Sequence, residues 1–188
     1  MQRSALFLDR DGVINVDRGY VHRPDQFEFI TGIFELARFA VNDLGWNLVV
    51  VTNQSGIGRG LFSETAYDHL TRWMCDRFAD ENAPITKVYH CPYHPEGIGA
   101  YRRDHPWRKP KPGMILQAAA DLDLDLLRSA IIGDSAEDVV AGAAAGIGLR
   151  IRIGPQNAIA TADRPAHEVV TNLEEALALL RYQLRSEK

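Results

Sequence analysis

Two aspartates separated by a single residue, Asp9 and Asp11, follow an apolar run at residues 5–8 and precede Gly12. Such a run is typical of a short strand buried on both faces, and ligands of a parallel α/β sheet bind beyond the carboxyl ends of its strands. Neighbouring carboxylates repel each other unless a cation or a shared proton offsets their charge. Mg²⁺ is the simplest such cation, because one or two carboxylates and a substrate phosphate usually hold it. A solvated turn rich in Asp and Gly is the alternative.

Three more polar side chains occur where apolar runs end or where a helix is about to begin. Thr52 follows the run 48–51, and Asp134 comes shortly after the run 130–132. Lys109 precedes a stiff segment with two prolines and then a predicted helix, which favours a cation in a fixed position. Because the strand ends of a parallel sheet lie along one edge, we expect these side chains beside the two aspartates.

This set of side chains suits phosphoryl transfer, in which positioning and electrostatic stabilisation carry most of the catalysis. Asp9 can attack phosphorus and form an aspartyl phosphate. Asp11 can protonate the leaving oxygen and later deprotonate the water that hydrolyses the intermediate. Lys109 would offset charge on the phosphoryl group, and Thr52 would hydrogen-bond it. Mg²⁺ between Asp9, Asp134 and the phosphate would keep the nucleophile anionic and close to its target.

The remaining pattern predicts one doubly wound α/β domain over residues 1–188, with a mainly parallel sheet and helices on both faces. No repeat, linker or low-complexity tract divides the chain. The expected strands are 5–8, 48–51, 85–89, 130–132, 149–153 and 168–170, and the expected helices are 31–45, 63–80, 112–121, 135–146 and one that Asn172 caps, with a loop at 154–165.

Two loops are expected to border the crevice. The irregular segment 15–30 would cover it and contact substrate through residues 17–20, and the segment 56–60 would form a flexible loop. Beside the crevice, Ser135 and Asp138 have the spacing of a capping box. Asp138 is therefore either a capping residue or a support for the site, and the sequence favours neither.

Composition narrows the class of protein. The chain has 188 residues, 46% of them hydrophobic, and a formal net charge of −4, which favours neither nucleic acid nor a membrane surface as a partner. Charged residues occur too early for a secretory signal, and no apolar run approaches membrane-spanning length. The two cysteines do not make a disulfide framework, and Cys75 is expected to be buried filler. We expect a cytoplasmic monomer.

Four segments resemble, in this order, the four motifs of the haloacid-dehalogenase-like phosphatases: D-R-D-G-V, V-V-V-T-N-Q-S-G, R-K-P-K-P-G and I-I-G-D-S-A-E-D. The runs N-V-D-R-G-Y-V-H, F-E-F-I, T-N-Q-S-G-I-G-R-G and C-P-Y-H-P are similar to the heptose-bisphosphate phosphatases of that family, and the likeness extends over about residues 5–180. It implies a Mg²⁺-dependent enzyme that removes the 7-phosphate of heptose 1,7-bisphosphate on the route to ADP-heptose and lipopolysaccharide core. It also implies small insertions in place of a cap domain.

The resemblance assigns roles to individual residues. Asp9 is the nucleophile, Asp11 is the proton donor, and both hold Mg²⁺ with Asp134, Asp11 through its carbonyl. Thr52 and Lys109 stabilise the phosphoryl group. The implied substrate-binding residues are Asp17, Arg18, Gly19, Tyr20, Thr52, Asn53, Gln54, Ser55, Arg108 and Lys109. The preferred anomer would depend on where Arg59, Arg108 and the loop 17–20 place the second phosphate.

The loop after the third strand departs from the family. Close relatives hold a structural zinc there with a C-x-H pair and a C-x-C pair, whereas Tyr93 and Trp107 occupy two of the four positions in this chain. The remaining candidates for a site that needs four ligands are Cys91, His94, His105 and His90. We therefore expect no structural Zn²⁺, and predict that the prolines and the packing of Trp107 hold the loop.

Two other functions fit part of the pattern. Histidinol-phosphate phosphatases share these motifs in a similar fold, although the run D-R-G-Y-V-H favours the heptose substrate. A phospho-receiver module also uses an Asp, a Thr and a Lys at strand ends. A receiver, however, carries its phosphoacceptor on a middle strand and lacks a partner acid two residues away, as Asp11 is here.

Overall fold

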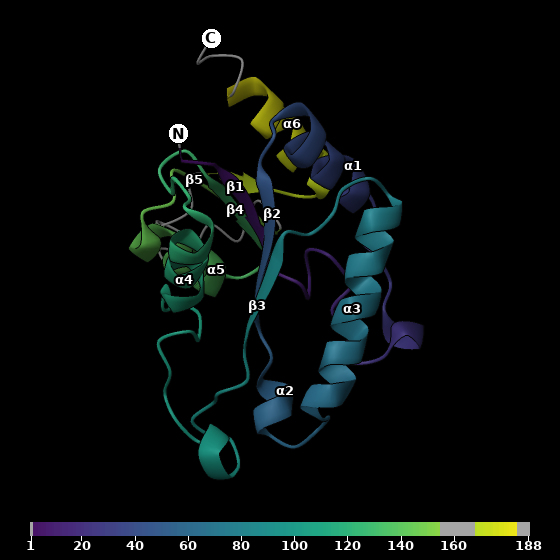
Figure 1. Cartoon of the computed structure of the whole chain (residues 1–188), viewed down its shortest axis with the longest axis vertical. Coiled ribbons are helices and arrows are strands. Elements are labelled where there is room, and N and C mark those ends of the chain that lie inside the picture. Colours follow the sequence, from purple (N-terminus) through teal and green to yellow (C-terminus); the bar gives the residue numbers. More distant parts are fainter. Residues whose placement is uncertain (1, 155–167, 184–188) are drawn as a thin grey trace.

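The computed structural model describes residues 2–154 and 168–183. Within them, six parallel strands form one sheet in the order β3-β2-β1-β4-β5-β6 (Figure 1). The strands are β1 (Ala5–Leu8), β2 (Asn47–Asn53), β3 (Lys87–Cys91), β4 (Ala130–Gly133), β5 (Leu149–Ile153) and β6 (Glu168–Val170). The strand order reverses between β1 and β4, and the crevice of a doubly wound sheet opens at that point. The order also differs from the 2-1-3-4-5 order of receiver modules.

Helices cover both faces of the sheet, as predicted. Figure 1 shows α1, α3 and α6 along one face and α4 and α5 along the other. The α-helices are α1 (Ile33–Arg38), α2 (Ser55–Gly58), α3 (Glu64–Asp80), α4 (Gly113–Leu122), α5 (Ala136–Ala145) and α6 (Leu173–Gln183); the shorter helical turns are η1 (Pro24–Gln26), η2 (Phe39–Asp43) and η3 (Gly99–Tyr101). None of the described helices is long and apolar enough to cross a lipid bilayer.

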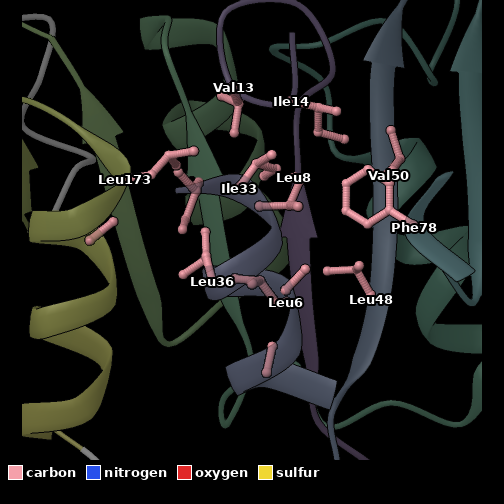
Figure 2. Close-up of a cluster of buried hydrophobic side chains, with 14 of the residues drawn as sticks. Leu6, Leu8, Val13, Ile14, Ile33, Leu36, Leu48, Val50, Phe78 and Leu173 are labelled. Atoms are coloured by element: carbon pink, nitrogen blue, oxygen red, sulfur yellow. The ribbon is translucent and has the colours of Figure 1, made fainter. Parts of the chain in front are cut away.

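The central strand is apolar throughout because it is buried on both faces. Leu6 and Leu8 point into the cluster beneath α1, α3 and α6 (Figure 2), whereas Ala5 and Phe7 point into the cluster beneath α4 and α5. Alternate residues of a strand face opposite sides of a sheet, so β1 joins the two cores. Burial of a large apolar side chain contributes about 1.5–3 kcal/mol to the stability of the fold. The buried strand therefore holds the residues that follow it in fixed positions.

Most of the predicted helix boundaries are confirmed. Ser63 caps α3 by accepting the N–H of Ala66 at 3.1 Å, and Ser135 and Asp138 form the expected capping box of α5. Gly146 ends α5 in the left-handed conformation, with φ of 85°. Asn172 Oδ1 accepts the N–H of Glu175 at 2.9 Å at the start of α6.

Four expectations need correction. The helix expected over 31–45 begins at Ile33 and continues from Phe39 as a π-helix, whose wider turn closes where Leu44 N–H donates to Phe39 O. The third strand lies two residues later than predicted, because pairing with β2 brings Tyr89 and Cys91 into the core.

The segment 56–60, expected to be a flexible loop, contains most of α2, with Gly56 and Gly58 buried and Gly60 exposed. Cys75 is only partly buried. The loop expected at 154–165 lies outside the described residues except for Gly154.

Candidate active site

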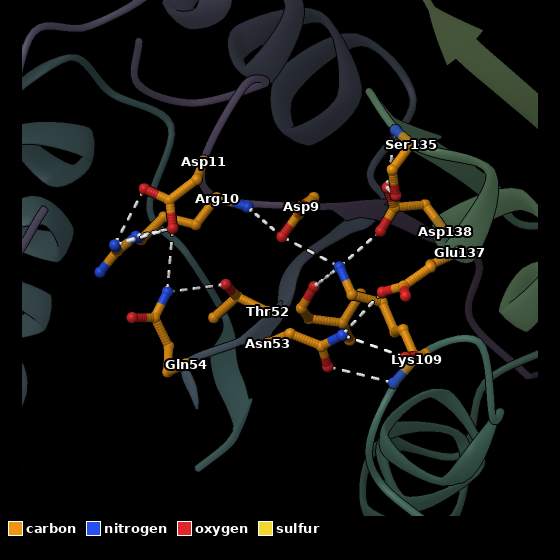
Figure 3. Close-up of polar contacts among 11 residues, drawn as sticks. Asp9, Arg10, Asp11, Thr52, Asn53, Gln54, Lys109, Ser135, Glu137 and Asp138 are labelled. Carbon is orange, nitrogen blue, oxygen red and sulfur yellow. Dashed lines mark hydrogen bonds and ion pairs between the residues drawn. The ribbon is translucent and has the colours of Figure 1, made fainter. Parts of the chain in front are cut away.

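Figure 3 shows Asp9, Thr52 and Lys109 together at the carboxyl edge of the sheet. Asp9 follows β1, Thr52 ends the buried part of β2, and Asp134 follows β4. Lys109 enters from the loop between β3 and α4, and its side chain is buried between Asp9 and Asp138. The strand ends supply the carboxylates and the hydroxyl, and the loop supplies the cation.

Lys109 is held by three acceptors, which matches the three donors of an ammonium group. Its Nζ lies 3.0 Å from Asp9 Oδ1, donates to Val51 O at 2.8 Å and donates to Asp138 Oδ1. Burial alone would lower the pKa of Lys109, but the carboxylates of Asp138 and Asp9 outweigh it and raise the pKa above its ordinary value. Lys109 is therefore a fixed positive charge beside the nucleophile candidate.

Asp138 both caps a helix and supports the site. Its Oδ2 accepts from Ser135 N at 3.1 Å and from Ser135 Oγ at 2.6 Å, while Oδ1 accepts from Lys109. Gly133 makes room for it, since a Cβ at that position would lie 2.1 Å from Asp138 Cβ. The two roles that the sequence left open are thus served by one carboxylate.

A group of three carboxylates marks a site for a cation. Oxygens of Asp9, Asp134 and Asp138 lie within 4.8 Å of one another, and they form the one such group of three or more potential ligands among the described residues. Burial raises the pKa of Asp9 to about 7, although Lys109 offsets part of this effect. Burial, and then the charge of Asp138, raises the pKa of Asp134 to about 6.

These residues fit a hard divalent cation. Asp138 is already occupied by Lys109 and Ser135, so Asp9 and Asp134 are the carboxylates available to a metal. Gly12 leaves space beside them, because a Cβ there would lie 1.9 Å from Asp134 Oδ2. A divalent cation would stabilise the ionised form of both carboxyls, whose pKa values burial raises.

The carboxylate of Asp11 points away from this group, into a separate set of donors (Figure 3). Arg10 Nη2 donates to both of its oxygens at 2.9 and 2.8 Å, Asn15 Nδ2 donates to Oδ1 at 3.0 Å, and Gln54 Nε2 donates to Oδ2 at 3.0 Å. Gln54 Nε2 also donates to Thr52 Oγ1 at 3.0 Å. Asp11 is thereby oriented toward the substrate cavity, and the metal contact through its carbonyl stays a prediction.

The sequence interpretation missed Arg10 and Asn15, whose side chains donate hydrogen bonds to the carboxylate of Asp11. Arg10 is 1% exposed and also donates to Val21 O at 2.8 Å, and Asn15 is fully buried. An arginine between two aspartates would ordinarily be solvated, so its burial gives no signal in the sequence. The D-R-D spacing gives a clue only in retrospect, since Arg10 can reach the carboxylate of its neighbour Asp11.

A cavity of about 370 Å³ lies beside Asp11. Most of the predicted substrate residues line it, and Gly56 adds to them; the lining residues are Asp11, Asp17, Gly19, Tyr20, Asn53, Gln54, Ser55 and Gly56. Arg18 instead pairs with Glu28 and lines a neighbouring hollow. The structure thus brings the two predicted substrate loops together around one cavity and places Arg18 outside it.

Two predicted substrate residues adjoin Lys109. Asn53 Nδ2 donates to Lys109 O, and Asn53 Oδ1 accepts from Lys109 N, both at 3.1 Å, so this side chain fixes the loop that carries the lysine. Arg108 is partly buried, and its Nη1 has no hydrogen-bond partner within the described part of the chain.

Three of the residues considered as zinc ligands contact other groups of the protein. Cys91 Sγ lies 3.9 Å from Tyr93 O, and the ring of His105 stacks on Tyr93 with centroids 4.2 Å apart. His94 Nδ1 accepts the N–H of Glu96. Trp107 packs into the core beneath α4 and α5, as predicted. That the loop binds no zinc stays a prediction.

Comparison with known proteins places this site in a family. Residues 106–176 match a family model described as HAD-hydrolase-like. The chain is 50% identical over 183 residues to the D-glycero-alpha-D-manno-heptose-1,7-bisphosphate 7-phosphatase of Burkholderia mallei. This match covers 96% of this chain and 95% of that protein. It is 51% identical over 154 residues to the D-glycero-beta-D-manno-heptose-1,7-bisphosphate 7-phosphatase of Vibrio cholerae, and the match covers 81% of this chain and 82% of that protein.

A solved structure agrees with these relatives. The D,D-heptose 1,7-bisphosphate phosphatase from B. bronchiseptica, complexed with magnesium and phosphate, superposes with a TM-score of 0.78 and 27% identity. The match covers 96% of this chain and 99% of that one. The chain therefore belongs to the D-glycero-D-manno-heptose-1,7-bisphosphate 7-phosphatases of the HAD-like hydrolases, and it is a phosphoric monoester hydrolase.

Proposed function

We propose that the chain removes the 7-phosphate of D-glycero-D-manno-heptose 1,7-bisphosphate through an aspartyl phosphate on Asp9, with Mg²⁺ as cofactor. The observation that carries the proposal is the contact of Lys109 with Asp9 at the end of the central strand, next to a cavity lined by the predicted substrate loops. The names of the similar proteins supply the substrate.

Asp9 is placed for nucleophilic attack. Arg10 N donates to its Oδ1 at 2.7 Å, and Lys109 Nζ lies 3.0 Å from the same oxygen. Within the described residues no hydrogen bond falls on Oδ2, so this oxygen would form the bond to phosphorus while the bond from phosphorus to the C7 oxygen breaks.

Asp11 would handle the protons. In the first step it would give a proton to the C7 oxygen as that oxygen leaves, and in the second it would take a proton from the water that attacks the aspartyl phosphate. Inorganic phosphate leaves and Asp9 is regenerated, so atoms and charge balance over the cycle. The hydrogen bonds from Arg10 and Gln54 orient this carboxylate.

Lys109 and Thr52 would stabilise the transferred group. Lys109 offsets negative charge on the phosphoryl oxygens, and Asp138 positions it. The hydroxyl of Thr52 would donate to a phosphoryl oxygen. Asp9 and Asp134 would hold Mg²⁺, which supplies Lewis-acid stabilisation of the phosphoryl oxygens when bound.

The two similar proteins are named for opposite anomers of the substrate and are 50% and 51% identical to the chain, so both anomers are assayed. The product, a heptose 1-phosphate, would feed ADP-heptose and lipopolysaccharide core synthesis.

A panel of substrates tests the proposal. Phosphate release is measured over many turnovers, with Mg²⁺, from both anomers of heptose 1,7-bisphosphate and from histidinol phosphate. Rapid release from at least one heptose anomer supports the proposal. Preference for histidinol phosphate would overturn the substrate but not the mechanism, and release of only one phosphate per chain would indicate a receiver and overturn both.

A further inference from the structure

Arg59 and His94 lie together at the edge of the site, and no step of the proposed reaction uses them. Arg59 ends the α2 turn, and His94 follows β3 in the loop that leads to Lys109. Arg59 Nη1 donates to the hydroxyl of Tyr20 at 3.1 Å, and Tyr20 lines the cavity beside Asp11. The side chain of Tyr20 therefore links Arg59 to the substrate cavity.

Arg59 and His94 face each other through nitrogen atoms that both act as hydrogen-bond donors. His94 Nδ1 accepts the backbone N–H of Glu96 at 3.0 Å, so the neutral ring carries its proton on Nε2. Arg59 Nη2 lies 3.1 Å from that Nε2, and a guanidinium group has donors only. Two donors cannot hydrogen-bond each other, so an acceptor that both can reach is missing from the pair. An anionic oxygen would supply it.

Cationic groups act on the His94 ring. Burial, and then the charges of Arg108 and Arg59, lower the pKa of His94, and these effects outweigh the opposing charges of Glu96 and Glu137. Arg59 Nε and Arg108 Nη1 are buried without a hydrogen-bond partner in the part of the chain that the structure describes. The carboxylate of Glu96 contacts Arg59 Nη2 at 2.8 Å, but its side chain is 75% exposed, so it can move aside for a ligand.

We propose that Arg59 and His94 form a second anion subsite, which binds the phosphate that is not hydrolysed. The inference rests on the proposed function, because a bisphosphate carries such a group. One phosphate oxygen accepts from Arg59 Nη2 and His94 Nε2 together. Through the hydrogen bond from Arg59 to Tyr20, a bound phosphate also holds the loop 17–20 over the cavity.

The test compares two substrates that differ in the second phosphate alone. Heptose 1,7-bisphosphate and heptose 7-phosphate are assayed with wild-type protein, Arg59→Gln and Arg59→Lys. Arg72→Gln is the matched control, since Arg72 is exposed on α3 and donates to Asp68 O of its own helix. Loss of hydrogen bonds to a charged group predicts that Arg59→Gln raises KM for the bisphosphate about tenfold to hundredfold, with kcat within about twofold.

Because Arg59 also donates to Tyr20, which lines the cavity, Arg59→Gln is expected to raise KM for the monophosphate far less than KM for the bisphosphate. Arg59→Lys is expected to be intermediate on the bisphosphate, and Arg72→Gln is expected to behave like wild type. An equal loss on both substrates, or no loss on either, overturns the subsite. If the wild-type protein hydrolyses no bisphosphate, the proposed function itself is wrong. Failure of the subsite and failure of the proposed function therefore give different results.

Binding of the product gives a measurement independent of turnover. Titration calorimetry with heptose 1-phosphate, which keeps the second phosphate, is expected to show weaker binding to Arg59→Gln and to His94→Phe than to wild type. Thermal unfolding followed by circular dichroism confirms that both variants are folded. Equal affinity in folded variants would contradict the subsite.

Discussion

Lys109 and Asp138 form an ion pair that is closed off from solvent, with side chains 3% and 0% exposed. The same lysine contacts Asp9, and the same aspartate caps α5 through Ser135. The cation that we propose to stabilise the phosphoryl group is therefore fixed by the first turn of a helix that packs on the central strands. Position of the charge and stability of the fold depend on one contact.

Removing the charge of Asp138 is expected to affect both the position of Lys109 and the stability of the fold. Asp138→Asn keeps the shape but leaves a buried ammonium with one carboxylate fewer, and loss of one partner of a buried pair costs about 3–5 kcal/mol. A misplaced Lys109 would lower kcat by about a hundredfold. Urea unfolding and steady-state kinetics measure the two effects. Asp104→Asn, at the exposed partner of Lys111, is the control and is expected to change neither. Wild-type stability in Asp138→Asn would contradict this account.

Stability of the metal-free protein is expected to fall as pH rises. The pKa of Asp9 is raised from 3.8 to about 7 and that of Asp134 from 3.8 to about 6, so the folded state binds more protons than the unfolded state between these values. The free energy of unfolding then decreases from pH 5 to pH 7. Chemical unfolding in chelator at these two pH values measures it, and Asp9→Asn is expected to flatten the slope. A metal-free protein that gains stability over this range would contradict the shifts.

Metal binding is expected to release protons for the same reason. A carboxyl that holds its proton near pH 6 must lose it before it can bind a cation, so Mg²⁺ affinity rises with pH up to about 7. Calorimetric titration with Mg²⁺ in two buffers of different ionisation enthalpy measures the protons released. Heats that do not depend on the buffer at pH 6 would contradict the prediction.

Arg10→Lys is expected to impair turnover although the charge is kept. The guanidinium group of Arg10 donates hydrogen bonds to both carboxylate oxygens of Asp11 and to Val21 O. The ammonium group of a lysine cannot reproduce this set of hydrogen bonds. With Asp11 no longer held, kcat would fall about tenfold or more. Arg72→Lys is the matched control on the surface. Unchanged kcat in a folded Arg10→Lys protein would mean that Asp11 needs no such support.

Gly133→Ala is expected to act through Asp138. The new Cβ would lie 2.1 Å from Asp138 Cβ, so the carboxylate must move away from Lys109. Overpacking of this kind typically costs about 1–3 kcal/mol, and kcat should fall with it. Gly154→Ala is a suitable control, since the nearest heavy atom among the described residues lies 3.9 Å from a Cβ there. Thermal unfolding and kinetics that are the same for both variants would contradict the prediction.

The sequence revealed the parts of the site that depend on strand ends. Asp9, Thr52 and Asp134 each follow a buried apolar run, and runs of a parallel sheet end at one edge, so their meeting was predictable. Arg10 was not predictable, because its burial depends on a distant carbonyl, that of Val21, as well as on its neighbour.

Local patterns also missed features that the whole fold decides. The widened turn from Phe39 has the same apolar spacing as an α-helix, and the extent of β3 is set by its pairing with β2. The pairing of Arg59 with His94 joins two loops 35 residues apart, and no spacing rule links them.

Phosphorus NMR of the reaction tests the central claim most directly. Heptose 1,7-bisphosphate is incubated with Mg²⁺ and either wild-type protein or Asp9→Asn, and the two phosphate resonances are followed over many turnovers. We predict that wild type converts the C7 phosphate to inorganic phosphate, that the C1 phosphate remains, and that Asp9→Asn leaves both in place. Loss of the C1 phosphate, or turnover by Asp9→Asn at the wild-type rate, would contradict the account.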